Sequence, residues 1–164
     1  MAKPTTHAPQ ICTAVSICAI IGIIAGLVNS NPLLIIMCLL PAAIYEAYRT
    51  EGKSTKAASY LLLAVVIIEL LLVFFDIDFN LASYLGTSEK SIGGYLVPLG
   101  NIKIVGPTLM GILAVILFVR TRGIYTRWLA VTIFITALAI VYAVDPAAFQ
   151  DLMKYVAEEG LNTI

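Results

Sequence analysis

The sequence predicts an all-α protein: a polytopic bundle of five transmembrane helices, followed by an amphipathic helix on the membrane surface. The first observation is composition, because 60% of the 164 residues are hydrophobic and only 12% are charged. A soluble domain is roughly half apolar and a quarter charged. About a third of the unfolded surface of a soluble domain of this size still faces water after folding, so the excess apolar surface of this chain has to face lipid. The second is that the apolar residues gather in five stretches, each near the length of about 20 residues that crosses a bilayer.

The five expected spans are, in chain order, residues 11–28, 33–48, 57–75, 104–119 and 124–144. No internal repeat and no Pro- or Gly-rich linker divides the chain, so we expect a single integral membrane domain, residues 1–164. The second stretch is short, and Pro41 removes a backbone donor from its middle. Four spans plus a re-entrant hairpin at this stretch is therefore the alternative.

Lys and Arg near the ends of the spans predict the orientation. In a five-span bundle seven of the ten basic residues lie on one side: Lys3, Arg49, Lys53, Lys56, Arg120, Arg122 and Arg127. Positive charge favours the cytoplasmic side, so we expect the N-terminus in the cytoplasm and the C-terminus outside. The expected location is the plasma (inner) membrane of a prokaryote.

Two segments are expected outside the bilayer. The external loop, residues 76–103, is unusually apolar, and a long loop of this kind is either functional or packed on something. The tail predicts an external amphipathic helix at 146–159, with Pro146 at its first position. Its expected contact face recurs at helical spacing: Phe149, Leu152, Met153 and Val156. This helix lacks the basic face that binds anionic lipid, which favours contact with protein.

A stripe of small residues runs along the first span. Ala14, Cys18, Gly22 and Gly26 recur at every fourth position, and the last two form a GxxxG motif. Small residues at this spacing let a second helix approach closely. The stripe predicts a helix-packing face, used within the chain or against another subunit.

Glu69 is the one ionisable residue deep inside a span. An acid at the middle of a bilayer costs at least ~2.5 kcal/mol, so it indicates a functional site by default. We expect the neutral acid, because an isolated carboxylate in hydrocarbon is far more costly. The functional interpretation is a proton-carrying or cation-binding carboxyl, and the structural one is a hydrogen bond that joins two helices. A helix rises about 1.5 Å per residue, and counting along the antiparallel spans on this basis places Thr108 and Thr136 at a depth in the membrane similar to that of Glu69. We therefore expect a hydrogen-bonding group near Thr108 or Thr136 to reach its carboxyl.

A second acid, Glu46, lies near the predicted end of the second span, beside Tyr45 and Arg49. At a membrane boundary a long charged side chain can extend its head into water or pair with a neighbour. We therefore expect Glu46 to be exposed or paired rather than catalytic.

Motifs for catalysis and for metal binding are absent from the sequence. There is no GxSxG, no HExxH and no P-loop, and the single histidine, His7, stands in the polar leader. The three cysteines lie in apolar runs without a CxxC pair. A net charge of zero gives no basis for a nucleic-acid partner. We expect a protein that is not an enzyme and holds no metal or cofactor.

Two functions fit these features. The first is a small, non-enzymatic integral membrane subunit that packs against other membrane proteins in a larger complex, because the stripe, the apolar loop and the tail all predict packing surfaces. The alternative is a small proton- or cation-coupled transporter that uses Glu69. The expected partners are the lipid bilayer and either other membrane-protein subunits or further copies of this chain.

Overall fold

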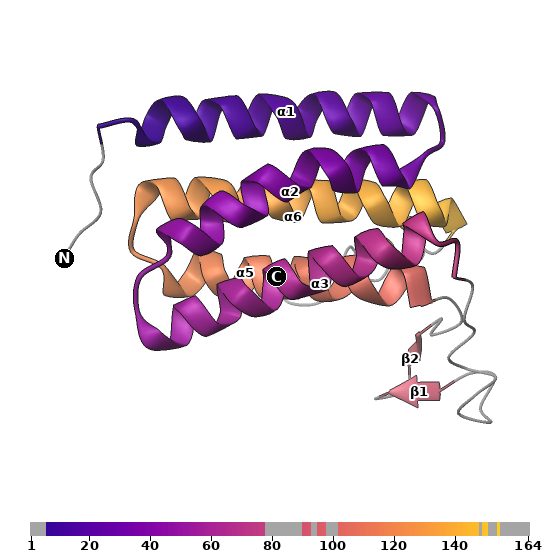
Figure 1. Ribbon diagram of the computed structural model, residues 1–164. Coiled ribbons are helices and arrows are strands. Elements are labelled where there is room, and N and C mark those ends of the chain that lie inside the picture. Colours follow the sequence, from indigo (N-terminus) through magenta and orange to yellow (C-terminus); the bar gives the residue numbers. More distant parts are fainter. Residues whose placement is uncertain are drawn as a thin grey trace.

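The computed structural model describes residues 6–77, 90–92, 95–97, 102–147, 149–150 and 154. Its helices are α1 (Ala8–Val28), α2 (Pro32–Arg49), α3 (Lys53–Phe74), α5 (Ile102–Arg120) and α6 (Ile124–Val144). They lie side by side as one bundle, with α1 at its edge (Figure 1). Each helix begins and ends within a few residues of its predicted bounds.

All five helices are long and apolar enough to cross a membrane. Successive helices run in opposite directions, so the start of α1 and the end of α6 lie at opposite ends of the bundle (Figure 1). The helix α2 is continuous through Pro41, and the re-entrant alternative therefore finds no support. The predicted multi-pass helix bundle is confirmed at this level.

Local signals explain the tight turn between α1 and α2. The Asn29 side chain donates to the carbonyl of Ala25, 2.8 Å away, and ends α1. The backbone N–H of Leu33 donates to Oδ1 of Asn31 at 3.0 Å, which caps α2 with Pro32 at its first position. The two helices are consequently held as an antiparallel pair.

The helix α2 lies at the centre of the packing. It contacts α1, α3 and α6, while α5 joins α3 to α6 and α1 also packs on α6. The apolar core around α2 draws on four of the five helices for its largest fully buried side chains: Ile35, Ile36, Leu39, Leu62, Val66, Met110, Leu117, Leu129, Ile133 and Ile140. Large apolar side chains also cover the outside of the bundle, as expected for a surface that faces lipid.

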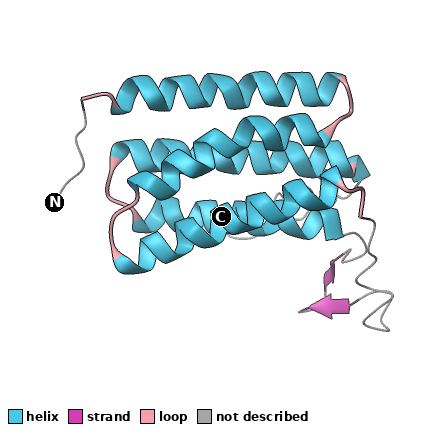
Figure 2. Ribbon diagram, viewed as in Figure 1, coloured by secondary structure: helices cyan, strands magenta, loops and turns pink. Residues whose placement is uncertain are grey.

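The loop expected at 76–103 contains a short hairpin that the sequence did not predict. Strands β1 (Lys90–Ile92) and β2 (Tyr95–Val97) pair antiparallel, with Lys90 opposite Val97 (Figure 2). Two glycines, Gly93 and Gly94, join them in the sequence, and Gly-Gly is a common link in two-residue hairpins.

The predicted tail helix lies mostly outside the described residues, including Leu152, Met153 and Val156 of its contact face. Its start is described. Oδ1 of Asp145 accepts from the N–H of Ala147 at 2.9 Å, as an N-cap residue does. The ring of Phe149 packs edge-to-face on Tyr142 of α6, with the ring centroids 5.5 Å apart.

Candidate functional site

Glu69 lies on the buried face of α3 and is 0% exposed. Among the residues that the structure describes, neither of its carboxyl oxygens has a hydrogen-bond partner. A buried polar group left without a partner costs about 1–3 kcal/mol, and more when it is charged. The position therefore carries a substantial cost that no hydrogen bond from a described residue offsets.

The wall facing this carboxyl is the backbone of α5 at Gly106. A Cβ placed on Gly106 would lie 2.0 Å from Oε2 of Glu69 and 2.9 Å from its Cδ. Real Cβ atoms do not approach other atoms that closely. The absence of a side chain at Gly106 is thus what gives the carboxyl its space.

The two threonines predicted to reach Glu69 bond to their own helices instead. The Thr108 hydroxyl donates to the carbonyl of Ile104 at 2.8 Å, and the Thr136 hydroxyl donates to the carbonyl of Thr132 at 2.7 Å. Depth counting found the right part of α5, because Thr108 is two residues from Gly106. The expected hydrogen bond from either threonine to Glu69 is not formed.

A lysine connects the Glu69 region with the nearer end of the bundle. Lys103 of α5 lies within electrostatic range of Glu69, and its Nζ pairs with Oδ1 of Asp76 at 2.7 Å. The lysine side chain is 12% exposed and the aspartate 83%. Polar groups therefore extend from near the buried carboxyl to the surface at this end, which we call the Asp76 end.

Glu46 of α2 is a second buried acid, also 0% exposed. Its Oε1 accepts from the hydroxyl of Ser59 at 3.1 Å and from that of Thr50. Its Oε2 has no partner in the described part of the chain. The sequence interpretation placed this acid at the boundary and missed its burial. Counting from the α2–α3 link puts Glu46 three residues inside α2 and Ser59 six residues inside α3, within about one helical turn in depth, and this is the signal that could have found the contact.

The small-residue stripe of α1 is divided in the structure. Gly22 and Gly26 are buried, and a Cβ on them would lie 2.3 Å from Cβ of Cys38 and 2.2 Å from Cγ1 of Ile35. Cys18 is half-buried and Ala14 is exposed. The two glycines are thus where α1 packs closest to α2, within the same chain.

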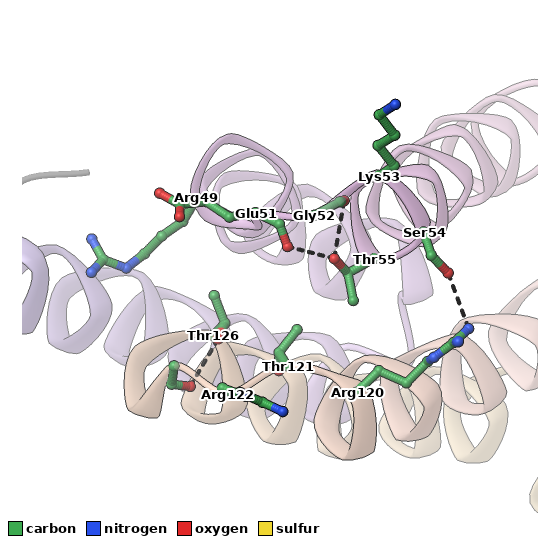
Figure 3. Close-up of a pocket in the computed structure, with 11 residues that line it drawn as sticks. Arg49, Glu51, Gly52, Lys53, Ser54, Thr55, Arg120, Thr121, Arg122 and Thr126 are labelled. Atoms are coloured by element: carbon green, nitrogen blue, oxygen red, sulfur yellow. Dashed lines mark hydrogen bonds between the residues drawn. The ribbon is translucent and has the colours of Figure 1, made fainter. Parts of the chain in front are cut away.

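A cavity of about 580 Å³ opens at the other end of the bundle, between the α2–α3 and α5–α6 links (Figure 3). We call this the basic end, because its lining includes Arg49, Lys53, Arg120 and Arg122. The cationic groups point in different directions, and Arg120 donates to the Ser54 hydroxyl at 3.0 Å (Figure 3). They do not converge on one point, so the cavity has the form of a polar vestibule rather than a tight anion site.

A second hollow, about 570 Å³, runs between α1 and α6. Nε1 of Trp128 donates to Oγ of Ser16 at 2.9 Å, and that oxygen is 3.2 Å from Oγ1 of Thr132. These polar contacts join the first helix to the last. The rest of this α1–α6 groove is mainly apolar, including Ile20, Ile23, Val131 and Ile135.

Neither protein-family models nor curated proteins nor solved structures give a match to this chain. Within the described ranges, no group of three His, Cys, Asp or Glu side chains could hold a metal ion. The two buried acids and their surroundings are therefore the features of this chain that indicate a function.

Proposed function

We propose that the protein moves protons or small cations across the membrane, with Glu69 as the coupling carboxyl. The observation that supports this is the complete burial of Glu69 with both oxygens lacking a partner among the described residues. A carboxyl that only joins helices needs an acceptor or donor on the neighbouring helix. A carboxyl that takes up and releases an ion instead needs space at its oxygens.

The surroundings favour a proton as the ion. The neutral acid is the less costly form of a carboxyl in an apolar site, so binding a proton removes the charge that burial penalises. The Lys103–Asp76 pair supports exchange with the Asp76 end, because it brings water-accessible charge close to the buried group. The same carboxylate can also bind a small cation, and ion-flux measurements distinguish the two ions.

The experiment is ion flux into liposomes that contain the purified full chain. An imposed pH gradient should collapse faster with the wild-type protein than in empty liposomes, and Glu69→Gln should slow that collapse by about a hundredfold, the usual contribution of a proton-transferring group. Parallel gradients of Na⁺ and K⁺ distinguish a cation from a proton.

Glu158→Gln is the matched control, because this acid lies beyond the last spanning helix in the sequence. Its flux should equal the wild-type flux. Wild-type flux from a correctly folded Glu69→Gln protein would refute the proposal.

A second candidate is association with other membrane proteins, and the α1–α6 groove favours it. The groove is lined by side chains of two helices, and a third helix could enter it. Single cysteines test this by cross-linking in native membranes. Ile135→Cys in the groove should give larger products, whereas Ile68→Cys on the exposed face of α3 should not. Equal cross-linking at both positions would remove the support from the groove.

The apolar external loop and the tail also belong to this second proposal, although the residues that would carry it are largely outside the described ranges. That the protein is not an enzyme and binds no cofactor likewise stays a prediction.

A further inference from the structure

We infer that Glu46, with Ser59 and Thr50, forms a second proton-exchange site at the basic end of the bundle. This inference rests on the proposed transport function and extends it to a residue that the Glu69 mechanism does not use. Glu46 and Glu69 would then exchange protons at opposite ends of the buried face of α3.

The placement of the two acids supports a shared route. Ser59, which contacts Glu46, and Glu69 both lie on the buried face of α3. Ten residues separate them, which is roughly 15 Å along a helix axis. The same face carries Leu62, Val65 and Val66 in between. An apolar section of two helical turns therefore separates a polar site at each end.

The single hydroxyl hydrogen of Ser59 allows this site to accept two protonation states of Glu46. Oγ of Ser59 lies 3.1 Å from Oε1 of Glu46 and also 3.1 Å from the carbonyl oxygen of Thr55. A hydroxyl has one hydrogen to donate. If Ser59 donates to Glu46, the acid can be a carboxylate. If Ser59 donates to Thr55, a protonated Oε1 can donate to Ser59 in turn.

The contact between Ser59 and Glu46 is thus kept whether Glu46 is a carboxylate or a neutral acid, and only a hydroxyl hydrogen has to rotate. Thr50 donates to Oε1 in either case, since that oxygen has a further lone pair. A structural hydrogen bond needs only one such arrangement. The ability to form both with little movement is what proton exchange requires.

Among the residues that the structure describes, no cation forms an ion pair with Glu46, and the charged groups on the helices packed around it make other contacts. Arg49 of α2 lies 5.0 Å from the centroid of the Tyr125 ring of α6, and Lys56 of α3 lies 5.7 Å from that of Tyr60. Arg127 of α6 donates to the carbonyl of Thr121.

The other titratable side chains near this end of α2 are Cys12 of α1, Tyr45 of α2 and Tyr125 of α6. The charged side chains of Glu51, Lys53, Arg120 and Arg122 line the vestibule. Both hydrogen bonds that the described residues make to Glu46 come from hydroxyl groups, so we expect its proton occupancy to depend mainly on these contacts and on burial.

Water reaches the neighbourhood of this site through the vestibule at the basic end. Arg49 and Glu51, on either side of Thr50, line that cavity, as does Thr55 (Figure 3). Thr50 itself is 2% exposed. A hydronium ion in the vestibule can give a proton to the Thr50 oxygen while the Thr50 hydrogen passes to Oε1 of Glu46. The products are water, an intact threonine hydroxyl and the neutral acid. Rotation of the new O–H bonds then turns the acid hydrogen toward Ser59 and the threonine hydrogen back toward Oε1, and the reverse steps release the proton.

Infrared difference spectra of the purified full chain, taken between mildly acidic and mildly alkaline buffer, test this site. The carbonyl-stretch band of protonated carboxylic acids should contain one component that Glu46→Gln removes and another that Glu69→Gln removes. The Glu46 component should still titrate in Glu69→Gln protein. Ser59→Ala should shift the Glu46 component, Ser59→Thr should restore it, and Thr13→Ala, which removes an exposed hydroxyl of α1, should leave it unchanged.

The outcomes separate the two proposals. A Glu46 component that is absent, or that stays constant across the buffers, overturns the second site whatever Glu69 does. A titrating Glu46 beside a Glu69→Gln protein with wild-type flux overturns the proposed role of Glu69 alone. In liposomes, Ser59→Ala should slow proton flux several-fold more than Thr13→Ala does, and equal flux in the two would also overturn the inference. Because Ser59→Ala leaves both acids in place, it keeps the test available if Glu46→Gln fails to fold.

Discussion

The carboxyl of Glu69 on α3 rests directly against the backbone of Gly106 on α5, with 2.0 Å between Oε2 and the position that a Cβ on Gly106 would occupy. Gly106 has no side chain, and a side chain at this position would occupy the space that the Glu69 carboxyl fills. The two residues are 37 positions apart in the sequence, so the site exists only when α3 and α5 pack.

Gly106→Ala should therefore impair transport without unfolding the protein. The added methyl group displaces a carboxyl at the movable end of a side chain, so the loss in the free energy of unfolding should be about 1 kcal/mol, the low end of the range for overpacking. Proton flux should nevertheless approach that of Glu69→Gln. The control is Gly111→Ala, whose Cβ would lie 3.8 Å from the ring of Phe134, an ordinary contact. Identical flux from the two alanine variants would contradict this prediction.

Gly22→Ala and Gly26→Ala should each weaken the packing of α1 on α2. Their new Cβ atoms would lie within 2.3 Å of Cys38 and Ile35, at atoms close to the α2 backbone, so the helices have to separate. The expected loss is about 1–3 kcal/mol per substitution, measured by unfolding in detergent. Ile20→Phe and Ile24→Phe add bulk on the exposed side of α1 and should have little effect. Comparable losses at all four positions would show that the glycines are not at a close contact.

The Asp76–Lys103 pair should make stability fall in acid. The hydrogen bond and the positive charge of Lys103 hold the pKa of Asp76 below its usual range. The pair therefore contributes fully above the pKa of an unfolded aspartate, about 3.9, and its contribution is lost as pH falls through the lower folded-state value. Asp76→Asn should flatten this part of the profile, and added salt should weaken the effect because the Asp76 carboxylate is exposed. A wild-type slope in Asp76→Asn would contradict the assignment.

Ser16→Ala should be visible in the fluorescence of Trp128, the only tryptophan in the chain. The substitution removes the acceptor for the indole N–H, so the emission maximum should shift. The stability cost should be about 0.6 kcal/mol, the average for hydrogen bonds between membrane helices. Thr13→Ala removes a hydroxyl that bonds only within α1 and should leave the emission unchanged. An unchanged spectrum for Ser16→Ala would mean that the contact between α1 and α6 is not formed in solution.

Single cysteines in a cysteine-free background should establish the topology. Lys53→Cys, at the start of α3, and Arg122→Cys, in the α5–α6 link, lie at the basic end. Both should react with an impermeant thiol reagent from one side of the membrane, expected to be the cytoplasm. Ser30→Cys, in the α1–α2 link, should react from the other side. If Ser30→Cys and Lys53→Cys react from the same side, α2 does not cross the membrane.

Hydropathy predicted the five helices because a backbone in lipid has to satisfy its own hydrogen bonds, which a helix does. Because a helix also has a constant rise per residue, counting residues along α3 and α5 could place Glu69 near the level of residue 108. It could not predict the bonding of Thr108, because a threonine in a helix can bond to the carbonyl four residues earlier just as well as to another helix.

The stripe on α1 shows a related limit. The strict four-residue spacing predicted Ala14 in the contact face, but the buried positions are Ala8, Cys12, Ser16, Ala19, Gly22 and Gly26. Their spacing is a mixture of three and four residues, since a helix has 3.6 residues per turn. The spacing of small residues alone could not locate the turn at which α1 meets α2.

The contact between Ser16 and Trp128 joins residues 112 positions apart, and this separation has a consequence for biosynthesis. When α1 and α2 first enter the membrane, the faces that they later bury against α6 have no partner from their own chain, because α6 has not yet been made. Lipid or an insertion factor has to cover those faces in the meantime. Assembly of the bundle is therefore completed when α6 packs on α1 and α2. In a chain truncated before Ile124, the faces of α1 and α2 that contact α6 would stay uncovered.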